Sequence, residues 1–402
     1  MKIYEVGGAV RDDLLGRTVA DRDWVVVGSS EAELKALGYR RVGADFPVFL
    51  HPQTKEEYAL ARTERKSGHG YKGFVTDSSE SVSLEDDLAR RDFTVNAMAR
   101  AADGTIFDPF GGQDDLAARV LRHVGPAFVE DPLRLLRAAR FSARLNFSIA
   151  PETMDLMQQI SASGELETIA PERVWQELRA ALNTDNPRCF IEVLRECGAL
   201  AALMPEIDRL FGVPQPEKYH PEIDTGLHIL LVLDQTVTLG ADEAVRFAAL
   251  VHDLGKGTTP AEILPSHRGH EVRGVELIEE FCDRLRVPRE HRELATVVSR
   301  LHTQVHRALE MRPGKLLQLL EEADAFRRDH RFEQMLLACK IDATGRTGLS
   351  HLPYEQIERL RQAYAVSKAI GAGDVEEPRP HGRELAVAIR QKRLAAITRS
   401  GI

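Results

Sequence analysis

The sequence predicts a mixed α/β head at the N-terminus followed by an all-α remainder, and three observations lead to this fold class. The first 125 residues or so alternate short runs of β type with turns. From Asp131 onward, helical periodicity replaces these runs almost completely. The length of 402 residues, at roughly 100 to 200 residues per domain, corresponds to two to four domains, and 43% hydrophobic residues can fill more than one core.

The head is expected to contain five short strands and a helix that follows the first of them. This helix is expected to run from about Ala9 to Leu15, directly after a pair of glycines. The strands are expected at residues 2–6, 23–28, 46–51, 57–62 and 105–110.

The helical part divides into further segments. Apolar residues at helical spacing predict helices at residues 135–145, 152–160, 172–182 and 189–203. A proline cluster separates them from a second helical group that begins near Asp224, and a weaker boundary lies near residues 345–353. We therefore expect a head at 1–140, a neck at 141–220, a second helical domain at 221–330 and a helical tail at 331–402. The tail is locally basic through Arg379, Arg383, Arg390, Lys392, Arg393 and Arg399.

Composition excludes several classes of protein. The net charge of −9, from 53 Lys+Arg and 62 Asp+Glu, lacks the global basic signature of non-specific nucleic-acid binding, so any such role must rest on local patches. The four cysteines have no C-x-x-C spacing, which argues against a zinc knuckle or a disulfide framework. No apolar stretch approaches the ~18 residues of a membrane span. We expect a cytoplasmic protein with no membrane partner.

The segment EVGGAVRDDLLG has the features of a phosphate-binding turn. Gly7 and Gly8 allow close approach of the backbone to a ligand, and the N–H groups that open the following helix can bind a phosphate beside Arg11. The match is neither G-x-G-x-x-G nor G-x-x-x-x-G-K, so ordinary turn chemistry is the alternative.

A pair of carboxylates, Asp21 and Asp23, precedes the apolar run Trp24 to Val27. Residues i and i+2 of a strand point to the same face, so the two carboxylates are expected side by side. Paired carboxylates together with substrate phosphates suit Mg²⁺. An acidic turn that caps the strand is the alternative. A third carboxylate ligand is not evident, and Glu64 is only a candidate.

Two clusters of arginines offer further anion-binding groups. Arg91 is suited to a triphosphate, and Asp92 to a ribose hydroxyl or to the N-terminus of the apolar helix expected in FTVNAMA. Further along, four arginines at spacings of three, three and four share one helical face with Asp131 beside them. There, Asp131 and the first arginine can hydrogen-bond the edge of a nucleobase, and the others can meet phosphate or RNA. Solvated charged faces are the alternative for both clusters. The four arginines are Arg134, Arg137, Arg140 and Arg144.

The helical half carries a possible metal site. His228 lies in TGLHILL, and the pair His252-Asp253 follows 24 residues later. Histidines from separate helices can converge on one metal in a bundle core, and ligation rich in imidazole suits a transition metal better than Mg²⁺. A histidine hydrogen-bonded within the core is the alternative. Four later histidines, each expected on a helix, are His267, His270, His302 and His306.

Six motifs in this order together resemble class II tRNA nucleotidyltransferases, the CCA-adding enzymes. The resemblance covers the whole chain and is closest to the bacterial members in which an HD-type phosphohydrolase domain follows the head and neck. It implies a polymerase-β-like nucleotidyltransferase head, and an HD-type domain at 221–330. The motifs are GGAVRD (7–12), DRD (21–23), RRDFTVNAMA (90–99), DPFGGQDDL (108–116), EDPLRLLRAARF (130–141) and ERVWQEL (172–178).

The resemblance also implies roles for the head. Asp21 and Asp23 would bind the catalytic Mg²⁺, Asp131 and Arg134 would pair with the incoming base, and the tRNA 3′-hydroxyl would attack the α-phosphate and release pyrophosphate. Asp92, which directly follows Arg91, is also counted among the expected nucleotide-binding residues. Contacts to ATP or CTP are implied for Gly8, Arg11, Arg91, Arg137 and Arg140.

For the second domain the resemblance implies phosphatase and 2′,3′-cyclic phosphodiesterase activity, with nickel as the expected metal. His252 and Asp253 would be catalytic, and Lys256 could hold a phosphate. The expected ligands are His228, His252, Asp253, His270 and His302.

Several alternatives stay open. The rival functions are a bacterial poly(A) polymerase, which shares the head motifs, an HD nucleotide phosphohydrolase with a sensor head, and an RNA-binding protein with inactive sites. The CCA interpretation is favoured by the short chain, the modest basic tail and the segment RVGADFPVFLHP (41–52). The partners would be tRNA, ATP and CTP, and the protein would be a monomer or a homodimer.

Overall fold

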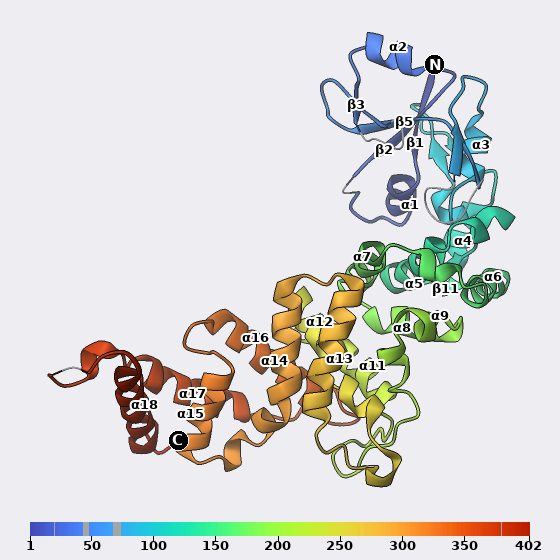
Figure 1. Ribbon diagram of the computed structural model, residues 1–402. Coiled ribbons are helices and arrows are strands. Elements are labelled where there is room, and N and C mark those ends of the chain that lie inside the picture. Colours follow the sequence, from blue (N-terminus) through green and yellow to red (C-terminus); the bar gives the residue numbers. More distant parts are fainter. Residues whose placement is uncertain (20, 43–47, 67–73, 379) are drawn as a thin grey trace. The chain divides into compact units, whose positions relative to one another are not determined.

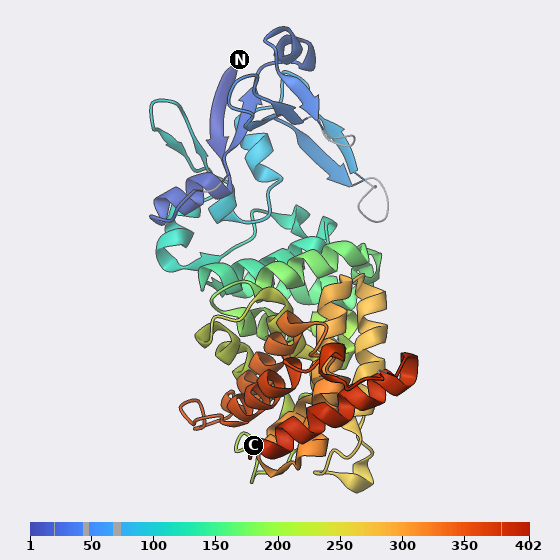
Figure 2. The same ribbon diagram turned by 90° about the vertical axis from the view of Figure 1, so that its left-hand side faces the viewer.

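The computed structural model describes residues 1–19, 21–42, 48–66, 74–378 and 380–402. It contains two compact units (Figures 1 and 2). The first unit comprises Met1–Glu177 and Glu192–Leu203, and the second comprises Leu178–Ile191 and Met204–Ile402. Helices α7 (Pro171–Leu182) and α8 (Pro187–Glu196) therefore contribute residues to both units.

A mixed sheet forms the framework of the first unit, as the sequence predicts (Figure 1). Strand β2 pairs with β1 in antiparallel and with β5 in parallel orientation. Of the predicted strand at 46–51, residues 46 and 47 lie outside the described residues, and the predicted strand at 105–110 is reduced to two residues. The order across the sheet is β3 (Arg40–Val42), β4 (Val48–Leu50), β5 (Glu57–Leu60), β2 (Asp23–Val27), β1 (Lys2–Val6), β8 (Ala99–Arg100) and β9 (Ile106–Phe107).

Apolar side chains of β2 point alternately to the two faces of this sheet, and each face is covered by an apolar cluster. Val25 packs in a cluster with Tyr4 and Leu88, whereas Val26 packs in a second cluster with Leu34 and Phe49. Leu34 belongs to α2 (Glu31–Ala36) and Leu88 to α3 (Leu84–Ala89), so each helix covers one face.

The remaining elements of the first unit are short, apart from the longer helices α5, α6 and α7. Two small sheets pair β6 (Thr63–Lys66) with β7 (Phe74–Asp77), and β10 (Val120–Leu121) with β11 (Ser148–Ile149). The helices are α1 (Gly8–Leu14), α4 (Gly112–Ala118), α5 (Leu133–Leu145), α6 (Pro151–Ala162) and α9 (Ala199–Leu203), together with the first part of α7. The predicted helix at 189–203 is broken, because Gly198 between α8 and α9 has a φ of 79°.

The prediction of a helix after Arg91-Asp92 is wrong. Only Thr94–Asn96 forms one turn of 3₁₀-helix, and the chain then enters β8. The chain leaves the helical path because Ala99 pairs with Val6 of β1 and the carbonyl of Met98 accepts from the N–H of Gly7 at 3.2 Å. The N–H of Phe93 donates to the side chain of Asp92 at 2.9 Å, and the N–H of Thr94 donates to the carbonyl of Arg122 at 2.9 Å.

A helical bundle forms the second unit (Figures 1 and 2). Helix α14 packs against α12, α13 and α16, and α11 packs against α12 and α16. The bounds are α11 (Thr225–Thr238), α12 (Glu243–Val251), α13 (His270–Leu285), α14 (Arg289–His306) and α16 (Asp329–Thr344), preceded by the short α10 (Pro205–Asp208).

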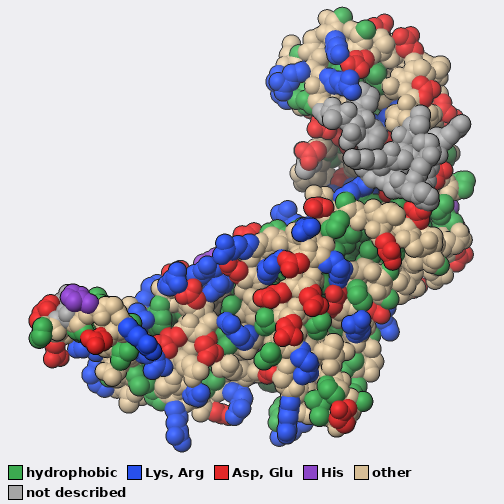
Figure 3. All heavy atoms as spheres, viewed as in Figure 1, with side chains coloured by type: hydrophobic (Ala, Val, Ile, Leu, Met, Phe, Trp, Pro, Cys, Tyr) green, Lys and Arg blue, Asp and Glu red, His purple; other side chains and the backbone are tan. Residues whose placement is uncertain are grey.

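Three further helices complete this unit. Helix α18 packs against α15 and α17. Their bounds are α15 (Pro313–Glu322), α17 (Gln356–Lys368) and α18 (Gly382–Arg399). None of the described helices is long and apolar enough to cross a membrane. On the face drawn in Figure 3, Lys and Arg side chains are interspersed with Asp and Glu.

Candidate active sites

A pocket of about 430 Å³ in the first unit is lined by all eight residues predicted to bind a nucleotide. It lies between the start of α1, the turn after α3, and α5. Asp23 and Glu64 also line this pocket, whereas Asp21 precedes β2 with an exposed side chain and is not among the lining residues. The eight residues are Gly8, Arg11, Arg91, Asp92, Asp131, Arg134, Arg137 and Arg140.

The glycine pair at the start of α1 makes room for an arginine. Gly7 has a φ of 71°, and a Cβ atom there would lie 2.7 Å from Nη1 of Arg91. A larger residue at this position would therefore displace the Arg91 guanidinium from the pocket wall.

The carboxylates at the pocket lie in different electrostatic settings. Partial burial raises the pKa of Asp23, with the charge of Arg91 opposing this shift and that of Asp21 adding to it. Glu64 lies beside two guanidinium groups, 2.8 Å from Arg62 Nε and 3.0 Å from Arg90 Nη1. Asp23 is thus the carboxylate that a bound cation would stabilise most directly.

Asp92 is a partner of Arg137 in the wall of the pocket. Its Oδ2 lies 2.6 Å from Nη2 of Arg137, while its Oδ1 accepts from the N–H of Phe93 and the side chain of Asn96. Burial of Asp92 is opposed by Arg137 and these hydrogen bonds, which lower its pKa, and the charge of Asp92 raises the pKa of Arg137. Because the predicted helix is absent, Asp92 does not act at a helix N-terminus.

The other arginines of α5 are also held in place. Arg134 donates to two backbone carbonyls, those of Ala127 at 3.0 Å and Arg90 at 2.6 Å. Arg140 pairs with Glu177 at 2.5 Å, and Arg144 pairs with Asp12 at 2.8 Å. The arginine face is thus organised by contacts within the first unit rather than left as a freely solvated surface.

Phe141 is a component of this pocket that the sequence analysis missed. Three guanidinium groups surround its ring, with Cζ–centroid distances of 5.0 Å for Arg11, 5.4 Å for Arg137 and 4.2 Å for Arg140. Its position four residues after Arg137 on the same helix was the available signal.

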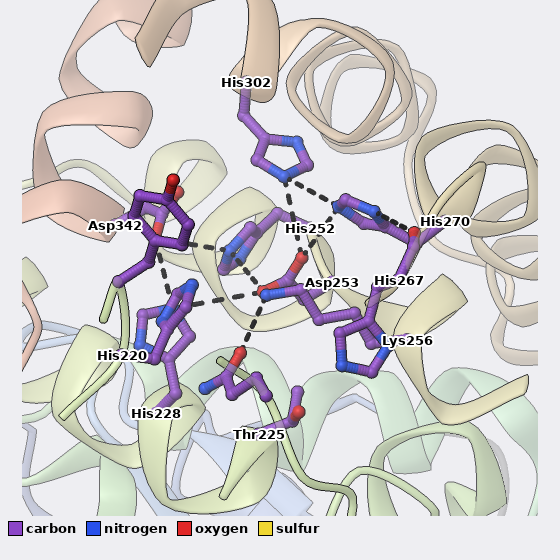
Figure 4. A network of polar contacts seen from close by, with 12 residues as sticks. His220, Thr225, His228, His252, Asp253, Lys256, His267, His270, His302 and Asp342 are labelled. Atoms are coloured by element: carbon purple, nitrogen blue, oxygen red, sulfur yellow. Dashed lines mark hydrogen bonds and ion pairs between the residues drawn. The ribbon is translucent and has the colours of Figure 1, made fainter. Parts of the chain in front are cut away.

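A second candidate site lies in the bundle of the second unit, where the five predicted metal ligands come together (Figure 4). His228 lies on α11, His252 and Asp253 at the end of α12, His270 at the start of α13 and His302 on α14. All five are almost completely buried. His267 was predicted on a helix but precedes α13, because Gly269 with a φ of 74° starts that helix.

Three of the imidazoles are oriented by the backbone. Nδ1 of His252, His270 and His302 lies 2.8, 2.8 and 2.9 Å from the carbonyl oxygen three residues earlier in the chain. Each proton is therefore expected on Nδ1, which leaves the Nε2 lone pair free for a metal, as is usual for metal-binding histidines.

Asp253 lies at the centre of the cluster and is 1% exposed. Neither of its oxygens accepts a hydrogen bond of good geometry, although Nζ of Lys256 lies 2.7 Å from Oδ2. Nε2 of His252 also lacks a hydrogen-bond partner. Although burial opposes ionisation, the interactions with His252 and Lys256 hold the pKa of Asp253 well below its usual value. Buried, ionised and incompletely bonded, this carboxylate fits a metal ligand.

Asp342, on α16, completes the cluster, and the sequence analysis missed it. Its Oδ1 lies 3.1 Å from Nε2 of His228, and its Oδ2 lies 2.6 Å from Nε2 of His306. A carboxylate on the buried stripe of α16, three residues after Cys339, was the signal that could have identified it.

Glu222 was missed as well. Its Oε1 lies 2.9 Å from Nδ1 of His228 and 3.1 Å from Nδ1 of His220. Glu222 therefore places a carboxylate within ion-pair distance of Nδ1 of His228, although that nitrogen makes no hydrogen bond of good geometry. Burial raises the pKa of Glu222, but its interactions with His220 and His228 outweigh burial and lower it.

A cavity of about 820 Å³ adjoins the cluster. His270, His302 and Asp342 line it, and so do the cationic side chains of Lys256 and Arg346. A buried group of imidazoles and carboxylates that opens into a cavity with cations suits hydrolysis of a phosphate ester.

Comparison with known families assigns the segments of the chain. Residues 3–122 match the model of the Poly A polymerase head domain, and residues 225–329 match the HD domain. Residues 146–211 match a model described as a probable RNA and SrmB-binding site of polymerase A. Asp342 lies beyond the segment that the HD model matches.

Curated relatives match the chain over almost its whole length. Multifunctional CCA proteins of Nitrosococcus oceani and Thioalkalivibrio sulfidiphilus are each 58% identical to it, over 99% of this chain and 98% of theirs. Among solved structures, the Bacillus stearothermophilus CCA-adding enzyme in complex with CTP is 25% identical with a TM-score of 0.66, covering 99% of this chain and 89% of that one.

Proposed function

The chain belongs to the family of multifunctional CCA proteins, CCA-adding nucleotidyltransferases that carry an HD domain, and on this premise we propose that it adds and repairs the 3′-terminal CCA of tRNA. CTP and ATP are the nucleotide substrates, and pyrophosphate is released. The observation that carries this proposal is the pocket of the first unit. Seven arginines line it against four carboxylates, a charge balance that suits a triphosphate.

The proposed roles in this pocket follow from what each side chain contacts. Arg11, Arg137 and Arg140, grouped around Phe141, bind the phosphates together with Arg91 beside the Gly7–Gly8 turn. Asp92 acts by orienting Arg137.

Two further pairs have proposed roles. Asp23 and Asp21 hold Mg²⁺, which supplies charge neutralisation at the α-phosphate when bound. Asp131 and Arg134 pair with the edge of the base, so that protein groups select C or A. The fixed guanidinium of Arg134 favours this role, because its backbone contacts hold it in one orientation. Glu64 is the candidate for a third carboxylate ligand.

Incorporation of labelled CTP and ATP into tRNA that lacks CCA tests this function. We expect CMP and AMP to be added in order by the wild type, and neither by Asp23→Asn. Poly(A) addition without use of CTP would instead identify a poly(A) polymerase. If Asp23→Asn left incorporation unchanged, the head would not be the catalytic site.

For the second unit we propose phosphatase and 2′,3′-cyclic phosphodiesterase activity. The ligands are the five predicted residues, His228, His252, Asp253, His270 and His302, with Asp342 added. Their imidazole content favours Ni²⁺ or another transition metal, which supplies an activated water when bound. Lys256 is held by Gln215 Oε1 at 2.9 Å and faces the cavity, where it binds the phosphate of the substrate.

A reciprocal pair of variants separates the two activities. His252→Ala is expected to abolish release of phosphate from a nucleoside monophosphate while CMP incorporation continues. Asp23→Asn is expected to do the reverse. Loss of both activities in either variant would contradict two independent sites, and loss of phosphatase alone in Asp23→Asn would favour an HD phosphohydrolase with a sensor head.

Basic side chains of α5 and of the tail are the proposed binding elements for tRNA. We propose that tRNA binds along the arginines of α5 and the basic tail, in the cytoplasm, to a monomer or a homodimer. Arg379 lies outside the described residues, and Arg390, Lys392 and Arg393 of the tail contact Glu321, Glu376 and the Phe326 ring. The boundaries at 140, 220 and 330 stay predictions, and the position of Asp342 favours an HD domain that continues through α16.

A further inference from the structure

We propose that Asn96 is a positioning residue of the pocket in the first unit, where its neutral amide orients Arg11 without cancelling the positive charge of that arginine. The proposal rests on the nucleotide addition proposed above and deepens it. Asn96 ends the 3₁₀ turn Thr94–Asn96, is 6% exposed and lines the pocket. It was missed by the sequence analysis, which assigned roles to Arg91 and Asp92 in the same motif.

The amide of Asn96 contacts two charged side chains of opposite sign. Its Oδ1 accepts a hydrogen bond from Nη1 of Arg11 at 2.5 Å, and its Nδ2 donates to Oδ1 of Asp92 at 3.0 Å. These neighbours fix the orientation of the amide, because its oxygen must face the guanidinium and its nitrogen the carboxylate. A carboxylate at this position would have no donor for Asp92, and an aliphatic side chain would have neither group.

Asn96 thereby connects two helices that line the pocket. Arg11 lies on α1, whereas Asp92 pairs with Arg137 of α5, with 2.6 Å between Oδ2 and Nη2. The contacts run without interruption from Arg11 through Asn96 and Asp92 to Arg137. Burial lowers the pKa of Arg11, and the charges of Asp12 and Asp92 oppose this shift. Asp92 is therefore close enough to attract the guanidinium of Arg11, and the amide between them keeps the two groups apart.

The guanidinium of Arg11 is held at all three of its nitrogens. Nε and Nη2 lie 2.8 and 2.7 Å from Oδ1 of Asp12, and Nη1 donates to Asn96. Its Cζ lies over the ring of Phe141, 5.0 Å from the centroid. Because a guanidinium is planar, these contacts determine the direction of its remaining N–H groups. The entropy of ordering the side chain is thus lost on folding and not on binding of a ligand.

A neutral partner leaves Arg11 with part of its charge uncompensated. Asp12 is shared between two guanidiniums, because its Oδ2 lies 2.8 Å from Nη2 of Arg144. Arg11 is 2% exposed, so water screens its charge poorly. A buried cation with incomplete compensation is stabilised by an anionic ligand, and a triphosphate is such a ligand. A carboxylate in place of the Asn96 amide would neutralise this cation before any nucleotide binds.

The backbone of Asn96 contacts a second arginine of the pocket. Its carbonyl oxygen accepts a hydrogen bond from Nη1 of Arg91 at 3.5 Å, and the same nitrogen lies beside Gly7. One residue thus contacts two of the arginines that we propose bind the phosphates. Because the contact with Arg91 comes from the backbone, a substitution at position 96 should alter the setting of Arg11 and preserve that of Arg91.

The turn that carries Asn96 is held in place by the motif DPFGGQDDL (108–116). Oδ2 of Asp115 accepts a hydrogen bond from Oγ1 of Thr94 at 2.6 Å. Gly112 lies so close to the carbonyl oxygen of Thr94 that a Cβ atom would overlap it. Within the turn, the N–H of Asn96 donates to the carbonyl of Phe93 at 2.9 Å. The fold therefore sets the position of the amide before a nucleotide binds.

Inorganic tripolyphosphate tests the proposal, because it offers the phosphates of a nucleotide without a base or a ribose. Its Ki against CTP is measured in CMP incorporation by the full chain, at constant free Mg²⁺ because tripolyphosphate binds that ion. We expect Asn96→Leu to raise this Ki, and the KM for CTP and for ATP, by about tenfold.

Asn96→Asp distinguishes the proposed role from a purely structural one. It preserves the shape of the side chain and the acceptor for Arg11, so a structural role predicts a milder effect than that of Asn96→Leu. The proposal predicts a larger rise in Ki, because the added carboxylate neutralises Arg11 and repels Asp92. Thr153→Val is the matched control. It removes a buried hydroxyl of the same unit, outside the pocket lining, that accepts from the N–H of His123 at 3.0 Å, and its Ki should equal that of the wild type.

The other outcomes contradict defined parts of the account. A Ki that is unchanged in both variants, or raised less by Asn96→Asp than by Asn96→Leu, would overturn the proposal while CMP incorporation continues. A change confined to CTP or to ATP would overturn it as well, by assigning Asn96 to base selection. Absence of incorporation by the wild type would instead contradict the proposed nucleotide addition. Circular dichroism verifies that Asn96→Leu is folded, and Asn96→Ser, with a rise in Ki expected in the same direction, replaces it if it is not.

Discussion

Arg137 and Asp92 form an ion pair in the wall of the pocket of the first unit, with Nη2 and Oδ2 2.6 Å apart and Asp92 buried. Asp92 is also bonded to the N–H of Phe93 and to Asn96, so it links the segment after α3 to α5. This link brings arginines of both motifs into the lining of one pocket.

Asp92→Asn should destabilise the protein, because it leaves Arg137 without its buried partner. Because Arg137 is partly exposed, we expect a loss of about 1 to 2 kcal/mol in the free energy of unfolding of the first unit, measured by urea denaturation, and a higher KM for CTP and ATP alike. Asp103→Asn, which changes an exposed acid of the same unit, is the matched control. An unchanged unfolding free energy would show that the pair contributes no net stability.

The same pair predicts a dependence on pH. The pKa of Asp92 is lower in the folded than in the unfolded protein, where carboxyls of this type titrate near about 3.9. Its contribution is therefore complete above the unfolded pKa and is lost as the pH falls through the folded one. The difference in unfolding free energy between wild type and Asp92→Asn should shrink below about pH 4; a difference that grows with acid would contradict this sign.

Phe141→Leu tests whether the aromatic ring organises the arginines that we propose bind the phosphates. The lost cation–π contacts are worth about 0.5 to 2 kcal/mol. We therefore expect KM to rise between about twofold and thirtyfold, by the same factor for CTP as for ATP. The ratio of kcat/KM for the two nucleotides should not change, because the ring contacts guanidiniums rather than the base-pairing groups. Phe147→Leu, buried in the same unit outside the pocket, controls for packing. A shift confined to one nucleotide would assign Phe141 to base selection instead.

Glu222→Gln tests the carboxylate behind His228. Removing the charge should weaken metal binding by about 10- to 100-fold, measured by competition with a chromophoric chelator. Glu222→Asp is expected to restore part of the affinity, and Glu217→Gln, an exposed acid of the same loop, should bind metal as the wild type does. Equal affinities in Glu222→Gln and wild type would show that His228 needs no orienting carboxylate.

The sequence predicted the elements whose signal is local. Strand β2 and helix α5 carry regular apolar periodicity, and GGAVRD or His252-Asp253 combine chemistry with a recognisable spacing. These features predicted the mixed sheet, eight residues that line the pocket of the first unit and five members of the histidine cluster of the second unit.

Other features depend on contacts between distant segments. The turn at Thr94–Asn96 does not continue as a helix because Ala99 pairs with Val6 of β1 and the carbonyl of Met98 accepts from the N–H of Gly7. Asp342, on α16, lies 89 residues after Asp253 in the sequence. A single carboxylate at that distance belongs to no motif with a recognisable spacing. Phe141 has a pocket role only because Arg11 packs against it from another helix.

The central claim is that the head of this protein builds CCA ends with the pocket that contains Asp23. Its most direct test is incorporation of labelled CTP and ATP into tRNA truncated before CCA, by wild type, Asp23→Asn and His252→Ala in parallel. The account predicts two CMP residues followed by one AMP for wild type and His252→Ala, and no addition for Asp23→Asn. Addition by Asp23→Asn at the wild-type rate, or addition of AMP alone by the wild type, would contradict it.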